Sequence, residues 1–582
     1  MGGQSRHWPL KSIEELDGGA VALRKDILTF EVLFDWLAQW PRLVVLAFAL
    51  AIALPGTSAL PPLDRDESRF AQATVQMLET GDFIAIRYQD TERNKKPVGV
   101  YWLQALSVST LSDVADREIW AHRIPSILAA LLAALFAFEI GRTLFDVRTG
   151  LLGALLLSAS PLFVGEATIA KTDMPLLATI LAAQWALARI YLRATNDEGG
   201  AVPITHVLPF WIAIGLGALL KGPVAPMVCG LTVLALCLRK PYLAWLTSLR
   251  PVLGAGIVAL IVAPWAVAIG IETEGRFFLE AIGVDMLGKV AAVQESHGAP
   301  PGAYAALVWI TFWPGALFLL PGLIFLWTER RTAAVAFCAA WAFPTWLVFE
   351  AASTKLPHYV LPAYPALALL AAAAIINGAG RGLTQKFSTG LWVLGGLAIL
   401  ALLLAAPARL SSGGVQAIDL VAAAGFATAA IAVGAAAWRG RRIAAALTAC
   451  LAGAALAAHL LESALPRFDA LQLTPRLEAV LEREGVHPLM SQDAKPVILI
   501  GYHEPSAVFL LGTPTLLTNP HNAAVALADG RSNIAVAEER TRVLFETEAA
   551  ALGVKLTALA SLDGLNYSRS ETARLTIYRA AP

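Results

Sequence analysis

The chain has 582 residues, of which 57% are hydrophobic and only 15% are charged, and its formal net charge at pH 7 is zero. Soluble globular domains are usually about 45–50% apolar and about 25% charged, so this composition predicts an integral membrane protein. A balanced charge gives no sign of a polyanionic partner, and we therefore do not expect nucleic-acid binding.

The N-terminal stretch "MGGQSRHWPLKSIEELDGG" is polar and of mixed charge, and it lacks an apolar core, so we do not expect a cleaved signal sequence. Residues 1–41 are expected to form a cytoplasmic segment, in keeping with the loop charges described below. After them, apolar runs approach the length of about 20 residues that a membrane-spanning helix needs. The thirteen predicted spans are 42–60, 123–141, 149–166, 173–192, 204–220, 222–238, 250–271, 303–327, 332–351, 357–377, 389–407, 418–438 and 443–463. All four cysteines fall in apolar runs without CxxC spacing, so we expect buried side chains rather than metal ligands or disulfides.

The short loops differ in Lys and Arg content, which predicts orientation because basic loops stay in the cytoplasm. Loops that follow even-numbered spans hold most of the arginines, among them Arg142, Arg148, Arg439, Arg441 and Arg442. This bias predicts a cytoplasmic N-terminus. The 61–122 loop, the 272–302 loop and residues 464–582 are then expected on the opposite, periplasmic or lumenal side.

The first long loop opens with the charged stretch "LDRDESRF" at residues 63–70. The periodicity of "ESRFAQATVQMLETG" predicts a helix lying on the membrane surface and ending at Gly81. Asp66 is expected as the N-cap of this helix and Glu67 as an acid of its first turn.

The loop continues with "RNKKPVGVYWLQA", in which Lys95 and Lys96 precede Pro97. The apolar run that follows is too short to span a membrane, so we expect it in the interface with Tyr101 and Trp102 at headgroup depth. The two lysines would either attract lipid headgroups or bind a phosphate inside a cavity.

Ionisable residues avoid the centres of the predicted spans and gather at their non-cytoplasmic ends. They are Glu166, Lys171, Asp173, Lys221, Glu272, Glu274, Asp285, Lys289, His297, Glu350, Lys355 and His358. Helix ends tolerate charge in any case, but ionisable groups beside a membrane are candidates for function. The absence of midplane carboxylates and of internal repeats in this sequence disfavours a secondary transporter.

The last 120 or so residues have a soluble pattern. The stretches "PRLEAVLERE" and "RTRVLFETEAAALGV" predict helices, the second ending at Gly553, whereas "PVILIGY", "AVFLLG", "NIAVAEE" and "ARLTIYRA" predict short strands. The pattern indicates a small α/β domain beside the membrane.

Four stretches occur in order along the chain: "DESRFAQATVQMLETGDFI", "NKKPVGVYWLQA", "AKTDMP" and "STKLPHYVLPAYPALALL". Together they resemble the bacterial aminoarabinose transferase family of lipid A modification and, through it, the wider protein O-mannosyltransferase-like group with the GT-C fold. The resemblance implies a polytopic α-helical GT-C domain at 42–463 with about 13 spans, and a periplasmic α/β domain at 464–582.

The resemblance also implies roles for particular residues. Asp66 matches an acidic residue that acts as general base or positions the acceptor, Asp173 matches the second acidic residue, and Glu67 is a further catalytic or metal-ligand candidate. Lys96 matches the lysine that contacts the lipid phosphate, with Lys289 and Lys95 as additional phosphate ligands.

The remaining candidates from the resemblance line the substrate cavity: Tyr101, Lys355, His358 and Tyr359.

Two positions depart from the family pattern, because Lys95 replaces a glutamate and Met286 replaces a histidine. Both are metal-ligand types in the family, so the resemblance supports no metal at that place. If a divalent ion binds, Asp66, Glu67 and Asp173 remain as oxygen ligands, which suit Mg²⁺ or Mn²⁺ better than zinc. Lys95 also favours a uronic acid or a neutral hexose over a cationic aminosugar.

The activity implied by the resemblance is transfer of a sugar from a polyprenyl-phosphate carrier at the periplasmic face of the inner membrane. The acceptor would be lipid A or another lipopolysaccharide or envelope glycan. Fixed cations would stabilise the leaving phosphate, and Asp66 would accept the proton of the acceptor hydroxyl. Two alternatives stay open: a protein O-glycosyltransferase of the same fold, and a non-enzymatic transporter of lipid-linked sugars.

Overall fold

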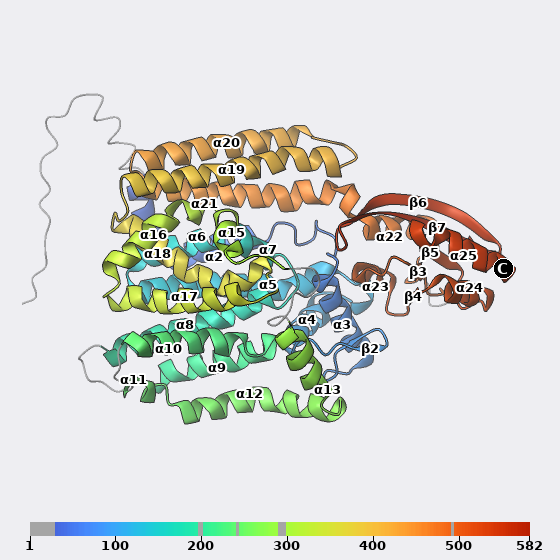
Figure 1. The fold of residues 1–582 in the computed structure, drawn as a ribbon, viewed down its shortest axis with the longest axis horizontal. Coiled ribbons are helices and arrows are strands. Elements are labelled where there is room, and N and C mark those ends of the chain that lie inside the picture. Colours follow the sequence, from blue (N-terminus) through green and yellow to red (C-terminus); the bar gives the residue numbers. More distant parts are fainter. Residues whose placement is uncertain (1–29, 196–201, 240–243, 289–297, 491–493, 582) are drawn as a thin grey trace, which may run out of the picture.

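The computed structural model describes residues 30–195, 202–239, 244–288, 298–490 and 494–581. Long apolar helices lie side by side in a bundle, and a small domain built on a β-sheet stands at one end of it (Figure 1). Between the two lie the helices of the first long loop, α3 (Asp66–Thr80) and α4 (Gly99–Leu111). The candidate site lies in this middle region.

Nine helices among the described residues are long and apolar enough to cross a membrane. They are α5 (Ile119–Leu144), α8 (Asp173–Thr195), α9 (Ile204–Lys221), α12 (Pro251–Glu272), α17 (Ala333–Ala351), α18 (Tyr364–Ile376) with the 3-10 turn Pro357–Ala363 before it, α19 (Leu383–Leu410), α20 (Ala417–Trp438) and α21 (Arg442–His459) with the turns that follow it. This chain is a multi-pass membrane protein.

The other predicted spans are bent or short. Three pairs of helices are bent by 68–114° at a short break: Phe30–Leu37 with α2 (Pro41–Ala53), α6 (Val147–Ser158) with α7 (Pro161–Ala167), and α15 (Ala303–Thr311) with Gly315–Glu329, which contains α16 (Leu319–Glu329). The single helix α10 (Val224–Arg239) is apolar but short. Each of the thirteen predicted spans thus coincides with an apolar helix or bent pair, while the number that crosses the membrane stays a prediction.

The breaks have a simple cause in at least two pairs, since Pro41 and Pro161 begin the second helix of their pairs. Proline lacks the N–H that would continue the preceding helix, but it is well suited to the first turn of a new one. Hydropathy alone does not register these bends.

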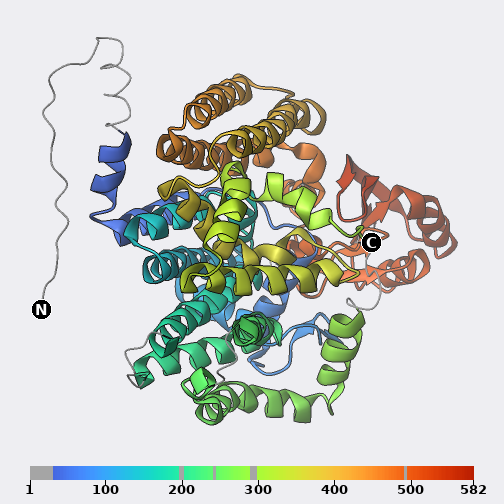
Figure 2. The ribbon, with the colours of Figure 1, turned by 60° about the vertical axis from the view of Figure 1, so that its left-hand side comes forward.

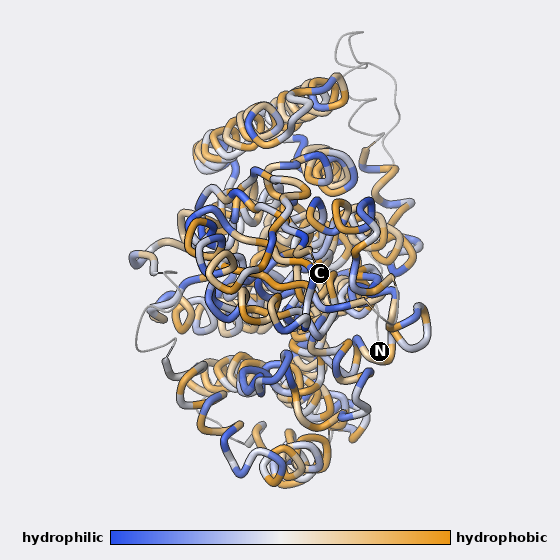
Figure 3. Tube along the Cα trace, turned by 90° about the vertical axis from the view of Figure 1, so that its right-hand side faces the viewer, coloured by the Kyte–Doolittle hydropathy of each residue, from blue (hydrophilic) through white to orange (hydrophobic). Residues whose placement is uncertain are grey.

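The outermost helices keep apolar faces uncovered. Only 17% of the α12 segment and 22% of α20 are buried, and Val252 and Leu260 are 88% and 77% exposed. These helices lie at opposite edges of the bundle, and their chains are rich in hydrophobic residues (Figures 2 and 3). Such faces are suited to lipid. Toward the interior, Cys229, Cys338 and Cys450 are buried and Cys237 is partly buried, as predicted.

The first loop differs from the expected surface helices. Helix α3 is buried along much of its length rather than lying on a membrane. It starts at Asp66 itself, so Asp66 is the first helical residue and Arg65 takes the cap position, with a left-handed φ of 67°. Its end at Gly81, which adopts the left-handed conformation, is as predicted.

Helix α4 also packs inward. The Tyr101 ring is 0% exposed and lies 5.3 Å from the ring of Phe70, so its predicted place at headgroup depth is wrong, whereas Trp102 is 39% exposed. The short hairpin of β1 (Arg87–Tyr88) and β2 (Thr91–Glu92) and the turn Val114–Asp116 complete the loop. The loop is a packed layer that closes one end of the bundle.

The C-terminal domain contains one five-stranded sheet in the order β4-β3-β5-β7-β6. Its elements are α22 (Leu473–Arg483), β3 (Ile498–Ile500), α23 (Pro505–Leu511), β4 (Leu516–Thr518), α24 (Pro520–Ala528), β5 (Ile534–Glu538), α25 (Glu539–Ala551), β6 (Leu556–Asn566) and β7 (Glu571–Ala580). Strand β3 runs parallel to β4 and β5, and β7 runs antiparallel to β5 and β6.

The sheet has a core on each face because successive residues of a strand point to opposite sides. Val497 and Leu499 pack with α22, whereas Ile498 and Ile500 pack with Phe545 of α25. The run "AVFLLG" is helix α23 and not the predicted strand. Proline at its start and full burial favour a helix here, and composition cannot separate short buried helices from strands.

Polar contacts seat this domain on the first loop. Arg117 donates from Nη1 to Gln72 Oε1 (2.7 Å) and to the carbonyl of Phe509 (2.9 Å), and from Nη2 to Glu79 Oε1 (2.6 Å) and Thr513 Oγ1 (3.1 Å). The guanidinium of Arg117 therefore bonds to both sides of the contact, to α3 and to the C-terminal domain. This contact fixes α3 from the side that faces away from the bundle.

Candidate active site

A cavity of about 850 Å³ opens where the ends of the helices meet the first loop. Six of the residues predicted from sequence line it: Asp66, Lys95, Lys96, Asp173, His358 and Tyr359. They come from α3, the turn before α4, the start of α8 and the turn before α18. Segments far apart in the sequence therefore supply one set of charged groups.

The Asp66 side chain is exposed to this cavity, whereas most of α3 beyond it is buried. Burial by the surrounding protein would raise the pKa of Asp66, but the positive charges of Lys171 and Arg93 outweigh it and hold that pKa below its usual value. The carboxylate is therefore ionised at neutral pH. An accessible, ionised carboxylate can accept a hydrogen bond, and then a proton, from a hydroxyl group.

Asp173, the first residue of α8, is 8% exposed and lies between two lysines. Lys221 Nζ, at the end of α9, donates to Asp173 Oδ1 at 2.6 Å, and Lys171 Nζ lies 3.7 Å from Oδ2. A helix N-terminus also favours a carboxylate. Asp173 is thus an ionised, fixed group rather than a free base.

The network extends behind Asp173 to Glu166. Lys171 Nζ lies 2.9 Å from Glu166 Oε2, and the ring nitrogens of His358 lie 3.8 Å from Glu166 Oε1 and 3.9 Å from Asp173 Oδ1. Burial would lower the pKa of Lys171, but Glu166 and Asp173 outweigh it and raise that pKa above its usual value. The lysine therefore stays charged beneath Asp66.

Sequence reasoning grouped Glu166, Lys171 and Lys221 with Asp173 at the same ends of the predicted spans but gave them no role in the site. Their signal was present, because each is an ionisable residue at the end of an apolar run: Glu166 and Lys171 shortly precede Asp173, and Lys221 directly follows the predicted span 204–220. What it could not give was the pairing, since Lys221 reaches Asp173 across 48 positions.

Glu67 does not line the cavity. Both of its oxygens face Arg123 of α5, with Nε to Oε1 at 2.9 Å and Nη2 to Oε2 at 2.8 Å, and both side chains are 0% exposed. The same carboxylate accepts the backbone N–H groups of Leu63 (2.9 Å) and Ala170 (2.8 Å). Glu67 is therefore a buried structural link, and its predicted place as a catalytic residue or metal ligand is not supported by this geometry.

Arg123 completes the link with its remaining donors. Nη1 donates to the carbonyls of Gly56, Thr57 and Leu60 at 2.7–3.1 Å, and Nη2 donates to the carbonyl of Pro61 at 3.0 Å. The guanidinium therefore holds the turn that leads into α3, and through Glu67 it fixes the start of the helix where Asp66 lies. Sequence reasoning missed Arg123, which reads as one basic residue near a helix end.

Cations gather on the loop side of the cavity, where Arg69 and Arg93 join Lys95 and Lys96 in the lining. Arg93 lies over the ring of Phe70 at 5.2 Å and donates from Nε to the Tyr101 hydroxyl at 3.3 Å. Tyr101 is thus not a lining residue but supports Arg93 from beneath. This group of cations is suited to an anion such as a phosphate.

Another part of the wall is apolar and comes from α12 and the segment that follows it. Trp265 and Val262 of α12 line it, together with Phe277, Phe278 of α13 (Arg276–Phe278) and Ile282 of the π-helical segment Leu279–Leu287. Lys289, the other predicted phosphate ligand, lies outside the described residues. The cavity therefore joins a charged side to an apolar side that continues toward a lipid-facing helix.

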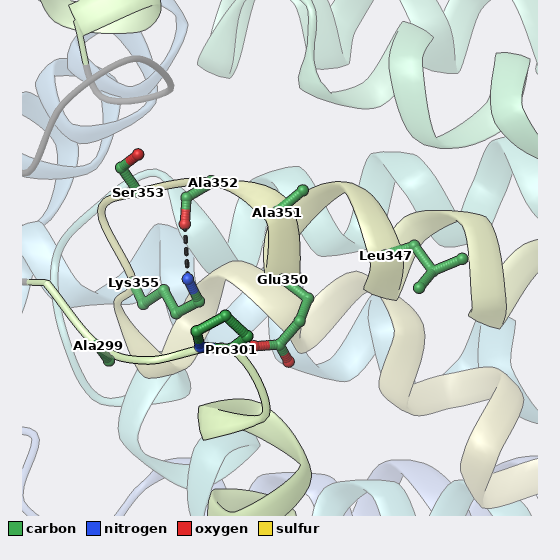
Figure 4. Close-up of a pocket in the computed structure, with 8 residues that line it drawn as sticks. All are labelled: Ala299, Pro301, Leu347, Glu350, Ala351, Ala352, Ser353 and Lys355. Atoms are coloured by element: carbon green, nitrogen blue, oxygen red, sulfur yellow. Dashed lines mark hydrogen bonds between the residues drawn. The ribbon is translucent and has the colours of Figure 1, made fainter.

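Lys355 lies in a separate, open depression beside the cavity, with Glu350, Ser353 and Pro301 (Figure 4). Its ammonium group donates to the carbonyl of Ala352 at 2.8 Å. Lys355 was predicted to line the main cavity, and that prediction is wrong.

The described residues do not form the divalent-cation site considered for Asp66, Glu67 and Asp173. No group of three or more His, Cys, Asp or Glu side chains in this part of the chain could hold a metal ion. The reason is geometric, because Glu67 is paired with Arg123 and ammonium groups lie against Asp173. These carboxylates already have cationic partners.

Comparison with known proteins agrees with this architecture. Residues 95–267 match the family model described as dolichyl-phosphate-mannose-protein mannosyltransferase. The undecaprenyl phosphate-alpha-4-amino-4-deoxy-L-arabinose arabinosyl transferase of Pseudomonas aeruginosa is 29% identical over 379 residues, covering 62% of this chain and 64% of that protein. The protein of the same name from Yersinia pestis is 30% identical over 337 residues, covering 57% and 58%. The chain thus spans less than two thirds of the length of these relatives.

The crystal structure of ArnT from Cupriavidus metallidurans bound to undecaprenyl phosphate superposes with a TM-score of 0.70 at 18% identity, over 94% of this chain and 98% of that one. A likeness at this identity establishes the fold. The predicted resemblance is confirmed: the chain is a relative of the aminoarabinose transferases and has the GT-C glycosyltransferase fold.

Proposed function

We propose that this chain is an integral-membrane glycosyltransferase that moves a sugar from a polyprenyl-phosphate donor to an acceptor at the periplasmic face of the inner membrane. The acceptor is lipid A or another lipopolysaccharide or cell-envelope glycan. The observation that carries the proposal is the cavity itself, whose lining combines the accessible carboxylate of Asp66, the cations Lys95 and Lys96, and an apolar wall.

Each side of the cavity suits one part of such a donor. The apolar wall of α12 and α13 takes the first isoprene units, and the remaining tail lies in lipid. Lys96, with Arg93 in the same lining, binds the phosphate. As the sugar departs, negative charge grows on the phosphate oxygen, and fixed cations lower the barrier by stabilising that charge.

Asp66 acts on the acceptor. The acceptor oxygen attacks the anomeric carbon, the bond from that carbon to the phosphate oxygen breaks, and a polyprenyl monophosphate leaves. The acceptor proton passes to Asp66, or is already absent if the nucleophile is a phosphate oxygen. Asp173 is held by Lys221 and Lys171 and orients the sugar hydroxyls rather than taking a proton.

The bias in basic loops supports a periplasmic site. The relatives are named for undecaprenyl phosphate, a lipid carrier, which supports a site at the membrane. In this proposal residues 1–41 are cytoplasmic, 42–463 form the catalytic membrane domain, including the first periplasmic loop 61–122, and 464–582 form a periplasmic domain.

The test is transfer by the purified full-length chain in nanodiscs from polyprenyl-phosphate sugars to lipid A. We expect Asp66→Asn and Lys96→Ala to lose transfer while keeping the melting temperature of the unaltered protein. Lys555→Ala, an exposed change on the C-terminal domain, serves as the matched control. Wild-type rates in both site variants would overturn the proposal, and sugar translocation without transfer would indicate a transporter instead.

A second candidate is a protein acceptor, which the description of the matching mannosyltransferase family model favours. Mass spectrometry of lipopolysaccharide and of envelope proteins from a deletion strain separates the two. Loss of a sugar from lipopolysaccharide supports a glycolipid acceptor, and loss from Ser or Thr peptides supports a protein.

A further inference from the structure

Among the residues that the structure describes, more positive than negative side chains line the cavity. They are two carboxylates, Asp66 and Asp173, and five cations, Arg69, Arg93, Lys95, Lys96 and Lys221. Lys221 is committed to Asp173 at 2.6 Å, and Arg93 is among the charges that act on Asp66. The surplus therefore lies on the loop side of the cavity.

Two of these cations have no anionic partner within the part of the chain that the structure describes. Among the residues that the structure describes, neither Arg69 nor Lys95 forms an ion pair, and the Lys95 side chain is exposed. Arg69 projects from the first turn of α3, and Lys95 from the turn between β2 and α4. Two separate elements thus present cations to one cavity.

A phosphodiester-linked donor does not account for this surplus. Its single phosphate carries one negative charge, and Lys96 with Arg93 is sufficient to match that charge. Further cations that line the same cavity repel one another, and this repulsion is relieved when a second anion binds. The arrangement therefore indicates a ligand with a negative charge beyond that of the donor phosphate.

We infer, on the basis of the proposed function, that the transferred sugar carries a carboxylate, so that the donor is a polyprenyl-phosphate-linked hexuronic acid, and that Lys95 together with Arg69 selects it. The relatives above are named for 4-amino-4-deoxy-L-arabinose, whose amino group is cationic at neutral pH. Such a sugar would meet like charge here. Selection of this kind combines attraction for one substrate with repulsion of the other.

The experiment compares kcat/KM for three synthetic donors on the same polyprenyl phosphate: glucuronate, its neutral counterpart glucose, and 4-amino-4-deoxy-L-arabinose. For the unaltered enzyme we expect glucuronate to exceed glucose by about tenfold or more, which corresponds to about 1.4 kcal/mol, and the aminosugar to be the poorest. Lys95→Glu should lower the value for glucuronate, raise that for the aminosugar and change that for glucose least.

Lys95→Gln, which removes one charge without reversing it, should give an intermediate preference, and Lys555→Glu on the exposed surface should leave the order unchanged. Melting temperatures of all variants in detergent report whether each is folded. If Lys95→Glu does not fold, the donor preferences of Lys95→Gln and of the unaltered enzyme still test the inference.

Three results would overturn the inference. Glucose or the aminosugar could be the preferred donor of the unaltered enzyme. The Lys95 variants could lower kcat/KM for all three donors by the same factor, which would assign Lys95 to the phosphate that the donors share. Alternatively, the effect of the Lys95 variants on kcat/KM could depend on the number of phosphates on the acceptor and not on the donor sugar. That result would assign the second anion to the acceptor. Absence of transfer from every donor would instead contradict the proposed function itself.

Discussion

Glu67 and Arg123 form an ion pair in which both side chains are completely removed from solvent. The pair lies directly behind Asp66, and Glu67 Oε1 also accepts the N–H of Ala170 at 2.8 Å, in the loop that carries Lys171. Through the backbone, this link sets the position of Asp66 relative to the charges around it. Asp66 and Glu67 are neighbours in sequence, but one faces the cavity and the other holds the fold.

Removing one member of this pair should be strongly destabilising. In Glu67→Ala the guanidinium of Arg123 stays buried without a carboxylate, and breaking a buried pair in this way costs about 3–5 kcal/mol. We expect a marked drop in the melting temperature of the full chain in detergent. The exposed pair of Asp563 and Arg574 offers the control, since Asp563→Ala should leave the melting temperature unchanged. Equal melting temperatures for both variants would contradict the role given to Glu67.

The pH dependence of transfer should report the ionisation of Asp66. Because its pKa lies below the ordinary value of 3.8, the carboxylate stays ionised as the pH falls to 5, and activity that depends on it should be lost only below about pH 4. Initial rates between pH 3.5 and 8 measure this.

Asp66→Asn should lower the rate by about 10²–10⁴, the usual contribution of a general base, with KM for the donor little changed. Asp66→Glu should restore part of the rate. An acid limb with its midpoint above pH 5 would assign the base to another group.

Asp173 and Lys221 should behave as a unit. Their 2.6 Å contact in a mostly buried place means that Asp173→Asn and Lys221→Met each leave the other charge without its main partner. The loss of transition-state stabilisation in the double variant should therefore be smaller than the sum of the losses in the two single variants. We expect a difference of about 0.5–3 kcal/mol. A double-mutant cycle on kcat/KM measures this coupling, and strict additivity would show that the two residues act independently.

Asp64 should make the seating of the C-terminal domain sensitive to pH. Its Oδ1 accepts the N–H of Ser506 at 3.2 Å and its own N–H donates to the Tyr567 hydroxyl at 2.6 Å, and burial raises its pKa to about 6. The folded chain therefore binds this proton more tightly than the unfolded chain, whose pKa is 3.8. The stabilising contribution is complete below pH 3.8 and is lost as the pH rises through about 6.

Asp64→Asn keeps the acceptor without the cost of a buried charge, so at pH 7.5 it should stabilise the chain by about 1–3 kcal/mol. The difference from the unaltered protein should shrink as the pH falls toward 4. Melting temperatures across this pH range measure it, with the exposed Asp529→Asn as a control that should show no such trend. A stability gain independent of pH would have a different origin.

The general architecture could be predicted from sequence because it depends on local composition. Long apolar runs give the helices of the bundle, and short runs rich in apolar and β-branched residues give β3, β5 and β7. The same local reading failed where two structures share one composition, as in "AVFLLG", which forms α23, and in the bent pairs, where apolar content continues through a break.

The sequence by itself also determined which residues are ionisable beside apolar runs, and six of the predicted set line one cavity. Only the tertiary structure decided which of them face that cavity. Successive residues on a helix point about 100° apart, so Asp66 and Glu67 have different surroundings, and no periodicity marks the difference. The partners Arg123, Lys171 and Lys221 come from other elements. Charge pairing across a fold depends on distances in space, which a linear pattern does not contain.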